Sequence, residues 1–291
     1  MRQAVNSLLL SWGRMAYWDG STRARPPRAA DAARGPRDGT ADSGAGSPTL
    51  VFLHGTGCDS ADWQEVLDRL PAGMRTVCMD FRGHGGSSVP SSAFTLEDLA
   101  GDVIELRRRL DLHAAVLVGH SLGGMVAMAA AARCQEIAGL LLLEGWTRLA
   151  ASAAFTGERF YGRLPPEAVR QIRQKAEATR RRFAAAVWDP FWRSVETFDA
   201  SPWLARAEIP VLDVYGAMGR DGHTEDRLLI PKNPRILLRW VDDAGHYLPH
   251  ECPREVARLC VEAAASVGGQ GAGLRAGVDE ARACDPRTRQ A

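Results

Sequence analysis

Long apolar runs are absent from this sequence of 291 residues. No stretch approaches the ~18 consecutive apolar residues of a membrane-spanning helix, so the sequence predicts no such helix. The short run Ser7–Leu10 is ended by Trp12, Gly13 and Arg14, and no small-residue cleavage site follows it. We therefore expect no secretory signal and a cytoplasmic location.

The sequence also has no excess of charge of either sign. Its 36 Lys and Arg residues nearly balance its 35 Asp and Glu residues, which gives a formal net charge of +1 at pH 7. This balance gives no reason to expect nucleic acid or an acidic membrane as a partner. A small molecule is therefore the expected ligand.

Paired cysteines and metal-binding motifs are missing as well. The six cysteines form no C-x-x-C pair, and several lie in apolar runs, which is typical of reduced and buried thiols. The sequence contains neither a metal-ligand constellation nor a phosphate-binding G-x-x-x-x-G-K motif. We therefore expect a reaction without a metal or an organic cofactor. The cysteines are Cys58, Cys78, Cys134, Cys252, Cys260 and Cys284.

Composition separates an ordered body from two polar segments. Residues 20–48 are rich in Arg, Ala, Gly, Pro, Asp and Ser, and residues 268–291 are similarly polar. Such segments bury too little apolar surface to offset the entropy of ordering, so both are predicted to be disordered. An anion-binding arm is an alternative for 20–48, but its aspartates dilute its arginines and favour a solvated linker. The N-terminal segment 1–19 is expected to add an edge strand over 15–19.

Six short apolar runs alternate with helical periodicity between residues 49 and 267. This alternation predicts the α/β class, with a mostly parallel sheet flanked by helices. Segment 146–207 interrupts the pattern, because it lacks strand signals and is helical, basic and aromatic. We interpret it as a helical cap on a core of residues 49–145 and 208–267, and expect a few of its aromatic side chains to line the site. The expected strands are 49–53, 75–79, 114–118, 138–143, 210–215 and 235–241.

The most informative motif is the G-x-S-x-G sequence Gly119-His120-Ser121-Leu122-Gly123. It lies between the expected strand 114–118 and a helix of small residues over 125–132, which is the context that such an elbow requires. A serine on this sharp turn needs glycines on both sides, because a Cβ there would clash with the neighbouring strand or helix. Ser121 is therefore the predicted nucleophile.

Three more motifs occur in order around this serine. They are His54-Gly55-Thr56-Gly57 after the first core strand, Asp80–Ser87 (DFRGHGGS) after the second, and Gly245-His246 near the end. Together the four motifs closely resemble the α/β-hydrolase superfamily, over roughly residues 49 to 267. The resemblance implies the α/β-hydrolase fold. It also implies an oxyanion hole built from the backbone N–H groups of Thr56 and Leu122.

A serine nucleophile needs a base within hydrogen-bond reach, and an imidazole can take and return a proton near neutral pH. His246 matches the histidine loop of the superfamily and is the predicted base. His250 is the alternative, but no glycine precedes it and Pro249 restricts its approach. The other histidines are expected to be loop or turn residues: His54, His84, His113, His120 and His223.

The acid of the triad is where this sequence departs from the common pattern of the superfamily. In many members the acid follows the strand after the cap, at a position where this chain has Gly219. A less common arrangement places it at the end of the strand before the cap, where Glu144 stands. Burying a carboxylate there is costly without a partner such as an imidazole N–H, so Glu144 is the preferred acid. Asp221 is the alternative acid if its loop is rearranged.

The resemblance thus implies a serine hydrolase that cleaves a small-molecule ester or lactone through an acyl-enzyme intermediate. A serine at position 121 argues against haloalkane dehalogenases and epoxide hydrolases, which attack with a carboxylate. A thioesterase acting on carrier-bound acyl chains is one alternative, because basic residues of the cap could meet an acidic acyl carrier protein; a solvated helix face explains the same charges. A ligand-binding or non-hydrolytic protein is another. The basic residues are Arg170, Arg173, Lys175, Arg180, Arg181 and Arg182.

Overall fold

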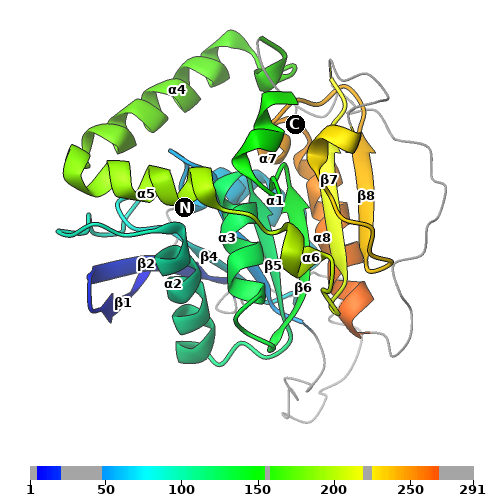
Figure 1. Cartoon of the computed structure of the whole chain (residues 1–291), viewed down its shortest axis with the longest axis horizontal. Helices are drawn as coiled ribbons and strands as arrows, with labels where there is room; N and C mark the ends of the chain where they lie inside the picture. The colour runs from blue at the N-terminus through cyan, green and yellow to red at the C-terminus, as the bar shows by residue number, and fades with distance from the viewer. Residues whose placement is uncertain (1–4, 21–47, 155–157, 219–224, 269–291) are drawn as a thin grey trace, which may run out of the picture.

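The computed structural model of the chain describes residues 5–20, 48–154, 158–218 and 225–268 (Figure 1). The two segments predicted to be disordered, 20–48 and 268–291, fall almost entirely outside these residues. Gly219 and Asp221 also lie outside these residues. Their predicted roles therefore stay predictions.

Eight strands form one sheet, in the order β1-β2-β4-β3-β5-β6-β7-β8. The six strands from β3 to β8 pair in parallel and coincide with the six predicted apolar runs, which confirms the α/β class. These six strands are β3 (Leu50–Leu53), β4 (Thr76–Met79), β5 (Ala115–His120), β6 (Ile137–Leu143), β7 (Val211–Gly216) and β8 (Ile236–Val241).

The N-terminal segment adds two strands, where the sequence predicts one at the edge. Strand β2 (Gly13–Asp19) contains the predicted strand and pairs antiparallel with β4, while β1 (Asn6–Leu10) pairs with β2 and takes the edge. The prediction of an edge strand over 15–19 is therefore wrong in its place in the sheet. The edge strand gives a weak signal because it is only half covered, and Leu9 stays 79% exposed.

Helices cover both faces of the sheet, and alternate strand residues point to each face. Leu53, Leu117 and Leu142 pack with α2 and α3, while Phe52 and Val118 pack with α1 and α8. Helix α2 begins with a capping box formed by Thr95 and Asp98. Among the described residues, no helix has the length and apolar character to cross a membrane. The helices are α1 (Gln64–Leu67), α2 (Leu96–Arg109), α3 (Leu122–Ala131), α7 (Leu248–Glu251) and α8 (Pro253–Gly268).

The segment 146–207, which we call the cap, leaves the sheet after β6 and returns at β7. Its longer helices are α4 (Pro166–Arg181) and α5 (Ala185–Thr197), followed by the short α6 (Ser201–Leu204). Figure 1 shows α4 and α5 lying together at one end of the sheet. Helix α5 joins the core through its buried side chains, whereas α4 buries only Thr179.

Most of the described cysteines are buried free thiols, as the sequence predicts. They are Cys58, Cys78, Cys134 and Cys260. Burial raises the pKa of Cys78, which keeps its thiol protonated and inert. Cys252 is instead disulfide-bonded, so the prediction of six reduced cysteines is wrong at this position. Spacing along a chain does not reveal which cysteines meet in space. Cys284 lies outside the described residues.

Candidate active site

Ser121 sits on a strained turn between β5 and α3. Its φ is 54° and its ψ is −119°, a backbone conformation that residues other than glycine rarely adopt. The flanking glycines leave no room for a Cβ, which would lie 2.4 Å from Gly123 O at Gly119 and 2.1 Å from Leu53 O at Gly123. The turn thus has the geometry that the G-x-S-x-G motif predicts, and it lifts the serine at the carboxyl end of β5.

Glu144 lies at the end of β6, one strand away from the serine. The carboxylate is fully buried, and Gly216 N donates a hydrogen bond of 2.7 Å to its Oε1. Its Oε2 lies 3.3 Å from Nδ1 of His246. The structure therefore brings together the acid and the base that the sequence favours. Ser121 is tied to the same strand, because its N donates to Leu143 O at 3.0 Å.

His246 lies on the loop between β8 and α7 and is held from several sides. Its N donates to Phe160 O of the cap at 2.9 Å, and its own carbonyl oxygen is 2.9 Å from Nε2 of His120. The ring is stacked on Phe160 (centroid distance 4.4 Å) and on Trp146 (5.1 Å). With Nδ1–H directed at Glu144, the neutral ring has its lone pair on Nε2, where a base needs it. The expectation that cap aromatics reach the site holds for Phe160.

The loop after β3 lies directly against the nucleophile. A Cβ at Gly55 would lie 3.2 Å from the Cβ of Ser121, which is tighter than most contacts of a Cβ, so glycine eases this approach. Thr56 follows it, and Leu122 begins α3, where the first N–H groups of a helix have no acceptor within the helix. The two predicted oxyanion donors thus follow Gly55 and Ser121 in the chain, and their role stays a prediction.

Three further buried histidines are not part of the pair that Glu144 forms with His246. Nε2 of His54 accepts a hydrogen bond from Phe81 N at 3.0 Å, and Nδ1 of His84 lies 2.9 Å from Arg82 O. Burial lowers the pKa of His54 and His120, and lowers that of His84 to about 3, so all three rings are neutral. Their contacts agree with the structural roles expected from the sequence.

The remaining histidines lie elsewhere. His250, the alternative base, has its Nε2 3.4 Å from Oδ1 of Asp62 and is not paired with Glu144. His113 is exposed and lies beside Asp111. His223 is outside the described residues.

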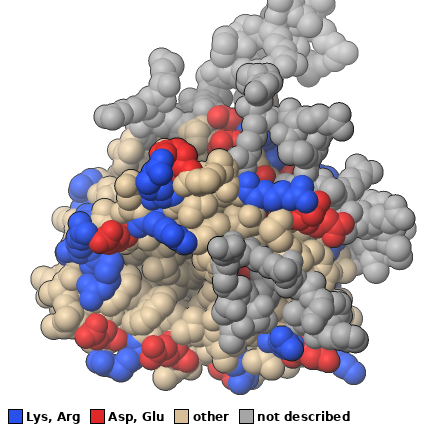
Figure 2. All heavy atoms as spheres, turned by 90° about the horizontal axis from the view of Figure 1, so that it is seen from above, with Lys and Arg blue, Asp and Glu red and all other residues tan. Residues whose placement is uncertain are grey.

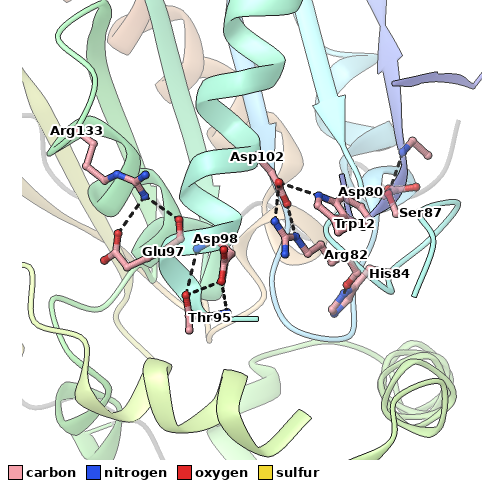
Figure 3. A network of polar contacts seen from close by, with 11 residues as sticks. Trp12, Asp80, Arg82, His84, Ser87, Thr95, Glu97, Asp98, Asp102 and Arg133 are labelled. Atoms are coloured by element: carbon pink, nitrogen blue, oxygen red, sulfur yellow. Dashed lines mark hydrogen bonds and ion pairs between the residues drawn. The ribbon is translucent and has the colours of Figure 1, made fainter. Parts of the chain in front are cut away.

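The DFRGHGGS loop is held by its own polar network. Arg82 makes two hydrogen bonds to Asp102 of α2, at 2.7 and 2.9 Å, and Trp12 donates a third to the same carboxylate (Figure 3). Asp80 accepts from Ser60 N at 2.7 Å and from Gly86 N at 2.8 Å, which is the turn-stabilising role expected for it. This network supports the loop and does not reach the serine.

The described residues offer no metal centre. No group of three or more His, Cys, Asp or Glu side chains within them is arranged to hold an ion. The groups that lie at this place are a serine hydroxyl, an imidazole, a carboxylate and backbone N–H groups.

Residues 50–259 match the model of the Alpha/beta hydrolase family. The matched region begins at β3, ends within α8 and includes the serine turn, Glu144 and His246. The chain belongs to the alpha/beta hydrolase family.

This alpha/beta hydrolase is 29% identical over 237 residues to pimeloyl-[acyl-carrier protein] methyl ester esterase of Sodalis glossinidius. The alignment covers 70% of the chain and 85% of the relative. It is 36% identical over 96 residues to 2-(acetamidomethylene)succinate hydrolase of Mesorhizobium japonicum, which covers 33% of the chain and 34% of the relative. The chain spans between 30% and 41% of the length of three curated relatives, this hydrolase among them.

Solved structures agree on the fold of this alpha/beta hydrolase. An esterase of Thermogutta terrifontis superimposes with a TM-score of 0.66 at 21% identity, covering 92% of this chain and 100% of that chain. At this level of identity the likeness shows the fold alone.

Some contacts of the site have no clear signal in the sequence. Phe160 lies 86 positions before His246, and nothing in its local sequence marks it as a partner of the base. Trp146 follows the predicted acid by two positions, so its closeness to the site could have been inferred from Glu144. Glu251 accepts hydrogen bonds from the histidine loop. Its only signal in the sequence is its position five residues after the base.

Proposed function

We propose that this alpha/beta hydrolase cleaves the acyl bond of a small-molecule ester or lactone through an acyl-enzyme intermediate on Ser121. The observation that carries the proposal is the fully buried Glu144 carboxylate 3.3 Å from Nδ1 of His246, beside a serine on a strained turn. A buried carboxylate costs several kcal/mol unless it has a partner, so this pair is expected to serve a purpose beyond packing.

In the first half of the reaction, Oγ of Ser121 attacks the carbonyl carbon of the substrate. Its proton passes to Nε2 of His246, and the carboxylate of Glu144 stabilises the resulting imidazolium. The oxyanion accepts hydrogen bonds from the backbone N–H groups of Thr56 and Leu122, each worth about 3 to 4 kcal/mol of the barrier. The tetrahedral intermediate then expels the alkoxide, which takes the proton from His246, and the acyl group stays on Ser121.

In the second half, water attacks the acyl-enzyme. His246 removes a proton from the water and returns it to Oγ of Ser121 as the ester bond breaks. The products are a carboxylic acid and an alcohol, or a single hydroxy acid where the substrate is a lactone. The residues named here account for every proton that moves.

An acyl group on a carrier protein is the second candidate substrate. The relative from Sodalis glossinidius is named for a methyl ester on an acyl carrier protein, and the sequence alignment covers 85% of it. Against this candidate, the basic residues of the cap are engaged within the chain. Lys175 pairs with Asp59 and Asp62, and Arg182 donates to backbone carbonyls. Among the described residues that Figure 2 shows on one face, Asp and Glu lie beside the Lys and Arg side chains. We therefore favour a free small molecule.

The test is covalent labelling with a fluorophosphonate ester, followed by intact mass. The wild-type chain is expected to gain one adduct, whereas Ser121→Ala and His246→Ala gain none under the same conditions. A folded wild-type chain that gains no adduct would contradict the proposal and favour a ligand-binding role. Initial rates on matched free esters, lactones and carrier-bound acyl chains then distinguish the substrate classes.

A further inference from the structure

The carboxylate of Glu251 is surrounded by backbone N–H groups of the histidine loop and the cap. Its Oε2 accepts hydrogen bonds from Gly245 N at 2.9 Å and from Arg163 N at 3.2 Å, and its Oε1 accepts one from Tyr247 N at 3.1 Å. Gly245 and Tyr247 are the two chain neighbours of His246, and Arg163 belongs to the cap. One side chain thus holds the base from both sides and connects it to the cap.

Further contacts join the same two segments. Phe160 O accepts from His246 N, and Arg163 forms an ion pair of 2.7 Å with Asp243. Gly162 has a φ of 57°, and a Cβ there would overlap the carboxylate of Glu251. The cap backbone therefore approaches this carboxylate as closely as glycine allows.

We propose that Glu251 is a positioning residue, whose ionised carboxylate locks the loop of His246 against the cap. Its catalytic consequence rests on the function proposed above, because it acts through His246 and touches no reacting atom. An ionised carboxylate only accepts hydrogen bonds, so it matches three N–H donors. Protonation would convert one carboxylate oxygen into an O–H group, which is itself a donor. Facing the N–H donors, this group would loosen the loop.

This lock is built to respond to pH near neutrality. Burial raises the pKa of Glu251 to about 7, and the negative charge of Glu144 adds to this rise, while the three N–H donors oppose it. Other charged or titratable groups of the described segments in contact are Arg163 of the cap with its partner Asp243, His246 itself, Tyr247, and His250 with its partner Asp62. We expect the lock to be closed above about pH 7 and to open as the pH falls below it.

The experiment compares the wild-type chain with Glu251→Gln, which keeps the shape and removes the charge. The control is Glu255→Gln, which removes a half-buried partner of Arg258 in α8. The first readout is the rate of fluorophosphonate labelling at pH 8. We expect Glu251→Gln to be labelled on Ser121 about 10- to 100-fold more slowly, the cost of a base misplaced by a fraction of an ångström to 1 Å, and Glu255→Gln at the wild-type rate.

The second readout is independent of activity. The chain has only four tyrosines, so labelling with ¹⁵N-tyrosine gives four amide signals, and Tyr247→Phe identifies that of Tyr247. In the wild type this amide signal is expected to shift with a midpoint near pH 7, and in Glu251→Gln the shift is lost. Thermal melting verifies that each variant is folded.

The outcomes separate the two proposals. An amide of Tyr247 that does not titrate between pH 6 and 8, or a Glu251→Gln chain labelled at the wild-type rate, would overturn the lock. A wild-type chain that is never labelled, but whose Tyr247 amide titrates as described, would contradict the hydrolase function and leave the lock in place.

Discussion

The two sides of the active site are held in different ways. The serine side is held by local backbone geometry, since Ser121 depends on the strained turn and on glycines within three positions of it. The histidine side is held by contacts between distant segments, because His246 is fixed by Glu144, Phe160 and the carboxylate of Glu251. On the serine side, a Cβ added at Gly119 or Gly123 would clash with the backbone. On the histidine side, the position of the base is expected to depend on the charge of Glu251.

The largest effect is expected from Gly123→Ala on the serine side. The new Cβ would lie 2.1 Å from Leu53 O, so the turn cannot form as it is. We expect loss of labelling and destabilisation by about 3 kcal/mol or more, which urea unfolding measures.

Gly101→Ala in α2 is the matched control, because its Cβ would meet nothing closer than 3.9 Å. This change should stabilise the protein by up to about 1 kcal/mol. Equal effects of the two substitutions would contradict the account of the turn.

Glu144→Gln tests the acid on the histidine side. An amide cannot stabilise the imidazolium, so turnover should fall by roughly 10³- to 10⁴-fold with folding intact. Asp221→Asn should change turnover far less. The reverse ranking in steady-state rates would transfer the role of the acid to Asp221.

Asp213 supplies a buried control for the same measurement. It lies in β7, and burial together with the negative charge of Glu144 raises the pKa of Asp213 well above its usual range. This shift favours the neutral form of the carboxyl, for which an amide is a close substitute, so Asp213→Asn should retain most of the activity. A loss as large as that of Glu144→Gln would show that both carboxyls are needed.

Lys175→Met tests the contact between the cap and the oxyanion side. Lys175 of α4 pairs with Asp59 at 2.8 Å and with the largely buried Asp62 at 2.7 Å, just after the loop that carries Thr56. Removing the cation leaves Asp62 with His250 and the backbone N–H of Asp59, and we expect a loss of about 1 to 3 kcal/mol in unfolding free energy. Arg170→Met, which removes an exposed pair with Glu167, should cost less than about 0.5 kcal/mol.

The smallest effect concerns the pH dependence of stability. The folded pKa of Glu251, about 7, lies above its ordinary value of 4.5, so the folded state binds this proton more tightly than the unfolded chain does. The stability that this bound proton gives the folded state is fully present below about pH 4.5 and is lost as the pH rises through about 7. Urea unfolding between pH 5 and 8 should show this decline in the wild type, and Glu251→Gln should show a shallower one.

The contrast between the two sides also explains what could be predicted from the sequence. The strands and the serine turn depend on neighbouring residues, so apolar runs and the glycines at 119 and 123 were sufficient to predict them. The pairing of Glu144 with His246 could be predicted because the resemblance to the superfamily allows an acid at this strand end, and a carboxylate buried there needs a partner such as an imidazole N–H. The position of the N-terminal hairpin and the disulfide at Cys252 depend on which distant segments meet, and no local pattern encodes that. The same is true of the contact from Phe160 to His246.

The most direct test of the central claim is the intact mass of the protein quenched during hydrolysis of an activated ester such as p-nitrophenyl butyrate. The account predicts one butyryl group per chain, mapped by peptide digestion to Ser121, which builds up while substrate is present and is lost once the substrate is exhausted. Rapid turnover by a chain that never carries the acyl group, or an acyl group mapped to another residue, would contradict it.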